Sequence, residues 1–504
     1  MTRSDGNIDP AFTALPLAEL ADAALDQARR GGASHAELRV ERAVGWHGRV
    51  RDRGVQGAAG EETVGLSVRV LLEGTWGFAG STELTTDSAA RAAAAALEVA
   101  TVSRPLNRDP VELAPEPAHE GTWISAYETN PFDVPPVDRT GLLLEWTGAL
   151  LAHPSVAHAD AALTCVQENK YYADLSGTTT VQQRLRIQPT ATAVAVDEAS
   201  GAFETMRTTA PPAGRGWEYV LGTGWDWTRE LAEIPELLAE KLAAPSVEPG
   251  LYDVVIDPTN LFLTIHESIG HATELDRALG YEAAYAGTSF ATLDQLGTLQ
   301  YGSPVMHVTG DRIAEHGLAT IGYDDEGVEA QSWDLIHDGI LVGYQLNRAM
   351  AARQGFGRSN GCAFADSPGH VPMQRMPNVS LQPSPGGPTT DELIGAMGSG
   401  LYIVGDKSWS IDMQRYNFQF TGQRFYRVRN GRLAGQVRDA AYQGVTTEFW
   451  GSMEAVGGES TYLLGGAFNC GKGQPAQIAP VSHGCPSALF RGVRILNAQQ
   501  EAGR

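Results

Sequence analysis

The chain has 504 residues, of which 42% are hydrophobic and 19% charged, a globular composition too long for one ordinary core. Its 60 acidic and 37 basic residues give a formal net charge of -23, which argues against a basic surface for nucleic acid or anionic membranes. The mean hydropathy is -0.20, no apolar run is long enough to span a bilayer, and the polar opening MTRSDGNIDP predicts no secretory signal.

Residues 1–215 predict an N-terminal α+β domain of mixed sheet and helix. Helical periodicity over 15–30 stops at Gly31-Gly32, and a second helix is expected over 85–100 with Thr86 or Asp87 as its N-cap. The stretch 103–136 is rich in Pro, Glu and Asp and predicts an exposed connection. Strand alternation and a further helix complete this part, with strands over 36–50, 64–72 and 159–195 and the helix over 139–151.

Residues 216–249 predict a connecting helix and linker, because an acidic amphipathic helix over 227–244 follows a Pro/Gly-rich shift in composition. From residue 250 to 504, strands and glycine-rich turns dominate, with short helices. We therefore expect a mainly β C-terminal domain that carries the catalytic chemistry.

An H-E-x-x-x-H string lies at the start of this second domain. A short buried strand over 252–257 precedes Pro258, which opens a predicted helix running through Glu274. His266 and His271 can bind Zn²⁺ through neutral imidazoles, and Glu267 can take a proton from a water that the metal activates. The pattern predicts metal-assisted amide hydrolysis. The alternative is that the string has no function and that two histidines flank a glutamate by chance.

The spacing of the two histidines is unusual. On a regular α-helix, residues at i and i+5 diverge by roughly 140°, so one ion does not easily reach both rings. A π-type turn at Gly270 would bring them into line, and we therefore expect the helix to widen around 268–270.

A third metal ligand has to come from elsewhere in the chain. Four cysteines (Cys165, Cys362, Cys470 and Cys485) are too few for a disulfide scaffold, so a reducing cytoplasm and a thiolate ligand are expected. Cys470 lies in a predicted glycine-rich loop with Lys472 nearby, a setting that lowers a thiol pKa and exposes the sulfur. Cys485 is its rival. Glu274 and Asp276 are better suited to orienting a ligand or to an ion pair.

The segment TIHESIGHATELD (264–276) resembles the metal-binding segment of the TldD/PmbA peptidases, whose pattern is close to HEAxGHxxEGD. Further similar segments follow in the family's order, and the resemblance covers most of the chain. They are Gly65–Val70 with Trp76–Ala79, Arg375–Asn378 with Pro383, Tyr442–Gly444 with Glu448–Trp450, and Cys470–Lys472. Leu275 departs from the family's E-G-D, and Gly473 and Gln474 make the C-G-K loop tighter than usual.

The retained histidines resemble those of the metal-carrying TldD-type subunits. This resemblance implies His266, His271 and Cys470 as zinc ligands, Glu267 as general base, and a heterodimer with a PmbA/TldE-type subunit that hydrolyses unfolded peptides. Two alternatives stay open: a hydrolase or lyase acting on a small peptide-like metabolite in a biosynthetic pathway, and a non-catalytic subunit.

Overall fold

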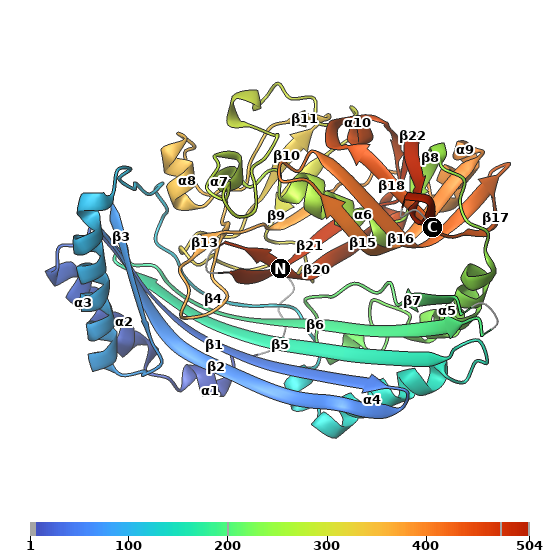
Figure 1. The fold of residues 1–504 in the computed structure, drawn as a ribbon. Coiled ribbons are helices and arrows are strands. Elements are labelled where there is room, and N and C mark those ends of the chain that lie inside the picture. Colours follow the sequence, from blue (N-terminus) through green and yellow to red (C-terminus); the bar gives the residue numbers. More distant parts are fainter. Residues whose placement is uncertain (1–6, 199–200, 474–475, 502–504) are drawn as a thin grey trace.

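The computed structural model describes residues 7–198, 201–473 and 476–501, shown as a ribbon in Figure 1. Helices and strands mix along the chain, which confirms the α+β class. Gln474, part of the tightened C-G-K loop, and residues 1–6 of the polar opening lie outside the described residues. Among the residues described, no helix combines the length and apolar character needed to cross a membrane.

Four long antiparallel strands dominate the N-terminal part and curve beneath the rest of the molecule in Figure 1. They belong to a seven-stranded sheet in the order β3-β2-β1-β5-β6-β4, with β7 paired to β6. The strands are β1 (His35–Arg51), β2 (Gly54–Leu72), β3 (Thr75–Ser81), β4 (Glu120–Ile124), β5 (His158–Asp174), β6 (Thr179–Val196) and β7 (Phe203–Arg207).

Helices cover the sheet at its two ends. The short α1 (Pro10–Thr13) precedes α2 (Leu17–Arg30), which packs with α3 (Thr86–Ser103) in one apolar cluster, while α4 (Pro136–Leu150) packs in a second. The proposed connection 216–249 contains α5 (Trp227–Ala243), whose Trp227 ring stacks on Trp146 of α4 at 4.6 Å between centroids.

One local prediction for this part is wrong and a second is incomplete. The N-cap of α3 is Thr85, not Thr86 or Asp87, because the Thr85 hydroxyl accepts a hydrogen bond from the Ser88 backbone N–H. The predicted connection 103–136 contains strand β4, which pairs in parallel with β6. Its five residues show little apolar alternation, so the pairing depends on a distant strand rather than on a local pattern.

The N-terminal sheet contacts the C-terminal part through buried ion pairs. Lys170 of β5 lies 2.7 Å from Asp325, and Arg69 of β2 lies 3.1 Å from Glu326. Arg39 of β1 donates hydrogen bonds to two backbone carbonyl oxygens of the segment 367–370. These contacts fix the relative position of the two parts, because each buried charge needs a partner on the other side.

The C-terminal part contains a second seven-stranded sheet in the order β15-β8-β22-β18-β16-β17, with β19 beside β22. Since β15 also pairs with β16, the strands from β15 to β16 close into a ring. The strands are β8 (Gly250–Ile256), β15 (Gly400–Ile411), β16 (Asn417–Arg429), β17 (Arg432–Val437), β18 (Ala440–Val445), β19 (Met453–Val456) and β22 (Ala488–Asn497).

Short elements surround this ring. The hairpin β20 (Leu463–Lys472) and β21 (Gln477–Cys485) lies against the helix α6 (Pro258–Ile265), where a Cβ atom at Gly465 would come within 2.7 Å of Phe262. The other strands are β9 (Val308–Asp311), β10 (Ser332–His337), β11 (Ile340–Leu341), β12 (Ala363–Phe364), β13 (Met373–Gln374) and β14 (Asn378–Leu381). The other helices are α7 (Leu275–Ala278), α8 (Arg348–Arg353), α9 (Thr390–Met397), α10 (Thr446–Gly451) and α11 (Ala498–Glu501).

Candidate metal centre

The helix that carries the H-E-x-x-x-H motif begins directly after strand β8. Asp257 caps it by accepting a hydrogen bond from the Thr259 backbone N–H at 3.0 Å, and Pro258 fits the first turn because its missing N–H is not needed there. After α6 a π-turn spans His266–Gly270. The helix therefore ends before Glu274, earlier than the sequence predicts.

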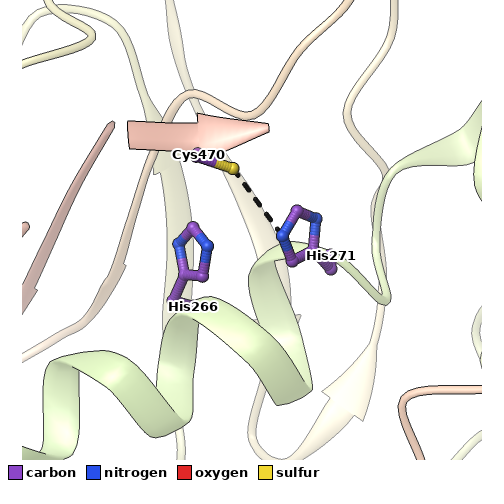
Figure 2. A group of neighbouring side chains, drawn as sticks. All are labelled: His266, His271 and Cys470. Atoms are coloured by element: carbon purple, nitrogen blue, oxygen red, sulfur yellow. Dashed lines mark hydrogen bonds between the residues drawn. The ribbon is translucent and has the colours of Figure 1, made fainter. Parts of the chain in front are cut away.

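The π-turn brings the two histidines of the motif together. The His271 backbone N–H donates to the His266 carbonyl oxygen at 3.0 Å, an i to i+5 hydrogen bond in place of the usual i to i+4 bond. Both rings consequently point to one side of the helix in Figure 2, with centroids 4.7 Å apart. The predicted widening of the helix around 268–270 is confirmed.

Neighbouring side chains hold the widened turn in place. The Trp450 indole N–H donates to the Ser268 hydroxyl at 2.9 Å, and the Tyr301 hydroxyl donates to the Ser268 carbonyl oxygen. Gly270 faces the buried Met376, whose sulfur would lie 2.5 Å from an added Cβ atom. A side chain at position 270 would therefore push this turn away from its support.

Cys470 reaches the same point from strand β20 (Figure 2). Its Sγ atom lies 3.7 Å from His271 Nε2, and a break in the pairing of β20 with β21 falls between Ala467 and Cys470. One ligand atom from each of His266, His271 and Cys470 lies within 4.8 Å of the other two. The structure thus brings all three predicted ligands together.

The predicted setting of Cys470 is wrong in two respects. Cys470 lies on a strand rather than in a loop, and it is 4% exposed rather than open to solvent. Lys472 forms ion pairs with Glu274 and Asp276. The rival Cys485 does not belong to this three-residue group, and its thiol lies 3.6 Å from the Pro258 carbonyl oxygen.

A third histidine, which the sequence interpretation missed, fixes the orientation of His266. His483 Nδ1 lies 2.9 Å from the Val379 carbonyl oxygen, and its Nε2 lies 2.7 Å from His266 Nδ1. Because a carbonyl oxygen only accepts, His483 donates from Nδ1 and accepts at Nε2 from the His266 Nδ1–H. This leaves Nε2 of His266 unprotonated and free to bind a metal.

Burial keeps both of these imidazoles neutral. It lowers the pKa of His266, and it holds the pKa of His483 well below its ordinary value with a further contribution from His266. A neutral ring with one protonated nitrogen is the state in which imidazole binds a metal.

His271 is oriented by a carboxylate. Its Nδ1 lies 2.8 Å from Glu274 Oε2, so it donates there and leaves Nε2, the nitrogen nearest Cys470, as the free donor atom. Burial by itself would raise the pKa of Glu274, but Lys472, His271 and Arg277 hold it well below its ordinary value. Glu274 therefore contacts the ring nitrogen away from the three-residue group, and Asp276 pairs with Lys472.

The surroundings also favour the thiolate of Cys470. Burial opposes ionisation, yet His271, when its ring carries the proton, and the Arg375 guanidinium lower the pKa of this thiol below its ordinary value. The buried Cys485 shows the opposite behaviour, because burial and Asp257 raise its pKa well above the ordinary value. A thiolate and two unprotonated imidazole nitrogens form a soft N/S donor set, which fits Zn²⁺.

Glu267 is the acidic neighbour of this group. It is 6% exposed, and its Oε2 lies 3.2 Å from Nη1 of Arg415. Arg415 was not identified from the sequence, because it lies 148 residues from Glu267 and in no recognised motif. The site thus combines a metal-binding donor set with a paired carboxylate beside it.

Comparison with known proteins gives consistent matches along most of the chain. Two family models match, the PmbA/TldA metallopeptidase C-terminal domain over residues 249–497 and the PmbA/TldA metallopeptidase domain 1 over residues 36–100. A metalloprotease of Methanothermobacter thermautotrophicus is 27% identical over 453 residues, covering 88% of this chain and 92% of the relative.

A zinc metalloprotease TldD homolog of Saccharolobus solfataricus is 25% identical over 54% of this chain and 57% of its own length. Among solved structures, TldE from Thermococcus kodakarensis superimposes with a TM-score of 0.73 at 15% identity, covering 94% of this chain and 99% of TldE. At that identity the likeness establishes a shared fold.

Proposed function

This chain belongs to the PmbA/TldD family of metallopeptidases, and on that premise we propose that it is a zinc-dependent peptidase that hydrolyses peptide bonds in unfolded or small peptides. The observation that carries the proposal is the convergence of His266, His271 and Cys470. In each ring Nδ1 is already hydrogen-bonded to another side chain, so Nε2 is free. This arrangement leaves three possible donor atoms within 4.8 Å of one another, which supports the proposal.

The metal proposed for this point is Zn²⁺. The donor set of two imidazoles and one thiolate favours it, and the Saccharolobus relative is named a zinc metalloprotease. A zinc ion held by His266, His271 and Cys470 would supply a Lewis acid that activates water and polarises the peptide carbonyl group.

We assign the proton transfers to Glu267. Its carboxylate adjoins His266 in the chain and is buried, so it can take a proton from the attacking water and pass it to the departing amine. His483 and Glu274 keep the two imidazole rings in the tautomer that leaves Nε2 free.

We further propose a PmbA/TldE-type partner subunit. The resemblance of the motif to metal-carrying subunits supports this assignment, and the fold match to TldE shows that such a chain has a similar shape. A cytoplasmic location is proposed on the four cysteines, all of which are buried free thiols.

The test is hydrolysis of a set of unstructured peptides by the purified chain, alone and mixed with a motif-less homologue. We expect activity that a chelator removes, that added zinc restores, and that rises strongly in the mixture. Chelator-resistant hydrolysis would contradict the metal proposal, and full activity of the isolated chain as one homogeneous species would contradict the partner proposal.

A further inference from the structure

Arg415 occupies a strained position at the tip of the hairpin formed by β15 and β16. Its φ angle is +63°, in the left-handed region that residues other than glycine and asparagine seldom adopt. The Asp412 side chain stabilises this turn by accepting backbone hydrogen bonds from Gln414, Tyr416 and Asn417. Non-glycine residues in such conformations concentrate at functional sites, where the surrounding structure enforces them.

The backbone of this hairpin tip is anchored independently of the Arg415 side chain. The Thr288 and Phe290 backbone N–H groups donate to the carbonyl oxygens of residues 413 and 414 at 2.8 and 2.9 Å. The Thr446 hydroxyl donates to the Arg415 carbonyl oxygen at 2.8 Å. The backbone from which the Arg415 side chain extends is therefore fixed by the fold and does not depend on the ion pair with Glu267.

The guanidinium group has hydrogen-bonding capacity to spare. Its two contacts are long, 3.2 Å from Nη1 to Glu267 and 3.3 Å from Nη2 to the Ala286 carbonyl oxygen. Nε is buried and has no hydrogen-bond partner within the described part of the chain. Charge-assisted bonds of this type are usually 2.7–2.9 Å, so Arg415 can bind a better-placed carboxylate than that of Glu267.

Two neighbouring cations are committed to other carboxylates, and a third, Arg375, donates to the Gln477 and Cys470 carbonyl oxygens. Arg277 pairs with Glu282 at 2.6 Å and with Glu274, and Lys472 pairs with Glu274 and Asp276. Arg415 differs from Arg277 and Lys472, since the carboxylate it pairs with among the described residues is the group proposed to act as base.

We propose that Arg415 binds a carboxylate of the peptide substrate next to the cleaved bond and, in doing so, releases Glu267 to act as base. This inference rests on the proposed function. The planar guanidinium group matches a carboxylate in a two-bond geometry, and the Glu267 carboxylate now takes the place of the substrate group. The carboxylate comes from either an acidic side chain or the peptide C-terminus.

The test uses matched peptides that differ in one carboxylate. One pair carries Glu or Gln beside the cleaved bond, and a second pair ends in a free acid or an amide. We expect the native protein, with its partner subunit, to prefer the acid of one pair by about 10- to 100-fold in kcat/KM, through a lower KM and, because Glu267 is released, a higher kcat. The pair that shows the preference identifies the source of the carboxylate.

Two variants remove the guanidinium group. Arg415→Gln replaces it with an uncharged amide, and Arg415→Gly also accepts the positive φ angle, so that a folding defect of the first is recognised by the second. Both should reduce the preference to about 1 while zinc content stays the same. The matched control is Arg432→Gln, on an exposed residue of β17, which should leave the preference unchanged.

A native ratio near 1 for both pairs, or equal losses on acid and amide peptides in the Arg415 variants, would overturn the inference and assign Arg415 to holding Glu267 alone. Hydrolysis of neither member of any pair would contradict the proposed function instead. In that case binding of the same peptides to the Glu267→Gln variant still decides the inference, because that variant keeps Arg415. Equal binding, or no binding, would overturn it.

Discussion

Within the described residues, two groups of side chains bring metal-binding atoms together, and they differ in what surrounds those atoms. His266, His271 and Cys470 are buried, whereas the side chains of His307, His337 and Asp338 are 40%, 56% and 68% exposed. The ring separations are almost the same, with centroids 4.7 Å apart in the buried pair and 4.9 Å in the surface pair. Proximity of donors therefore does not distinguish the two groups.

The difference lies in the contacts behind the rings. His266 and His271 each have an outer hydrogen-bond partner within 2.8 Å, and these partners are themselves buried and bonded. In the surface group His337 Nδ1 lies 3.6 Å from Asp334, and His307 Nδ1 accepts a hydrogen bond from the Asp338 backbone N–H at 3.4 Å. Rings held this loosely lose rotational freedom when they bind a metal, so we expect the buried group to retain zinc and the surface group not to.

The largest expected effect is on catalysis in the Glu267→Gln variant. The amide cannot accept a proton at neutral pH, so kcat should fall about 10²- to 10⁴-fold while zinc stays bound. Steady-state kinetics with zinc analysis of the same sample checks this. Asp338→Asn, the corresponding change in the surface group, should leave kcat unchanged. A Glu267→Gln variant with most of the parental kcat would exclude this residue as the base.

A smaller effect is expected when the partner of His266 is removed. His483→Leu leaves the His266 Nδ1–H without an acceptor, and zinc affinity should fall about 10- to 100-fold. His483→Gln offers an amide oxygen to the same N–H and should recover part of the loss. Competition with a chromophoric chelator measures both variants, and unchanged affinity in His483→Leu would contradict the role assigned to it. Asp334→Ala, behind the surface His337, is the control and should have no effect.

The widened helix turn should be sensitive to one methyl group. Gly270→Ala places a Cβ atom against the buried Met376, so the free energy of unfolding should fall by about 1–3 kcal/mol. Gly141→Ala in α4 meets no atom within 4 Å and should not destabilise the fold. Chemical denaturation of both variants tests this, and equal stability would show that the turn tolerates a side chain at position 270.

The smallest effects are expected at the surface group. His307→Ala and His337→Ala remove partly exposed rings with long contacts, so stability should change by less than about 0.5 kcal/mol. Thermal unfolding of both variants, with and without excess zinc, measures their stability and any stabilisation by zinc. A zinc-dependent rise in melting temperature that disappears in His337→Ala would show that this group binds zinc after all.

More of the metal site than of its surroundings can be predicted from the sequence. The i to i+5 spacing and Gly270 were enough to predict the π-turn, because helix geometry is local. The resemblance to a family then placed Cys470 beside the two rings. The many glycines around Cys470 predict an exposed loop. In the structure they belong to strand β20, and glycines such as Gly465 allow this strand to approach α6 closely.

What the sequence did not predict depends on contacts between distant segments. His483 acts through His266, which is 217 positions away, and Arg415 acts at Glu267, which is 148 positions away. The sequence around each of these two residues does not indicate which distant residue it contacts. Strand β4 and the buried ion pair of Lys170 with Asp325 were missed for the same reason, since tertiary pairing rather than local propensity determines them.

The most direct test of the account is zinc content per chain after extensive dialysis, measured by elemental analysis in the parent and in single alanine variants. We expect about one zinc in the parent and in Cys485→Ala and His337→Ala, because these two residues lie outside the buried group. His266→Ala, His271→Ala and Cys470→Ala should retain close to none. Near-stoichiometric zinc in both histidine variants of the buried group would contradict the assignment of the metal centre.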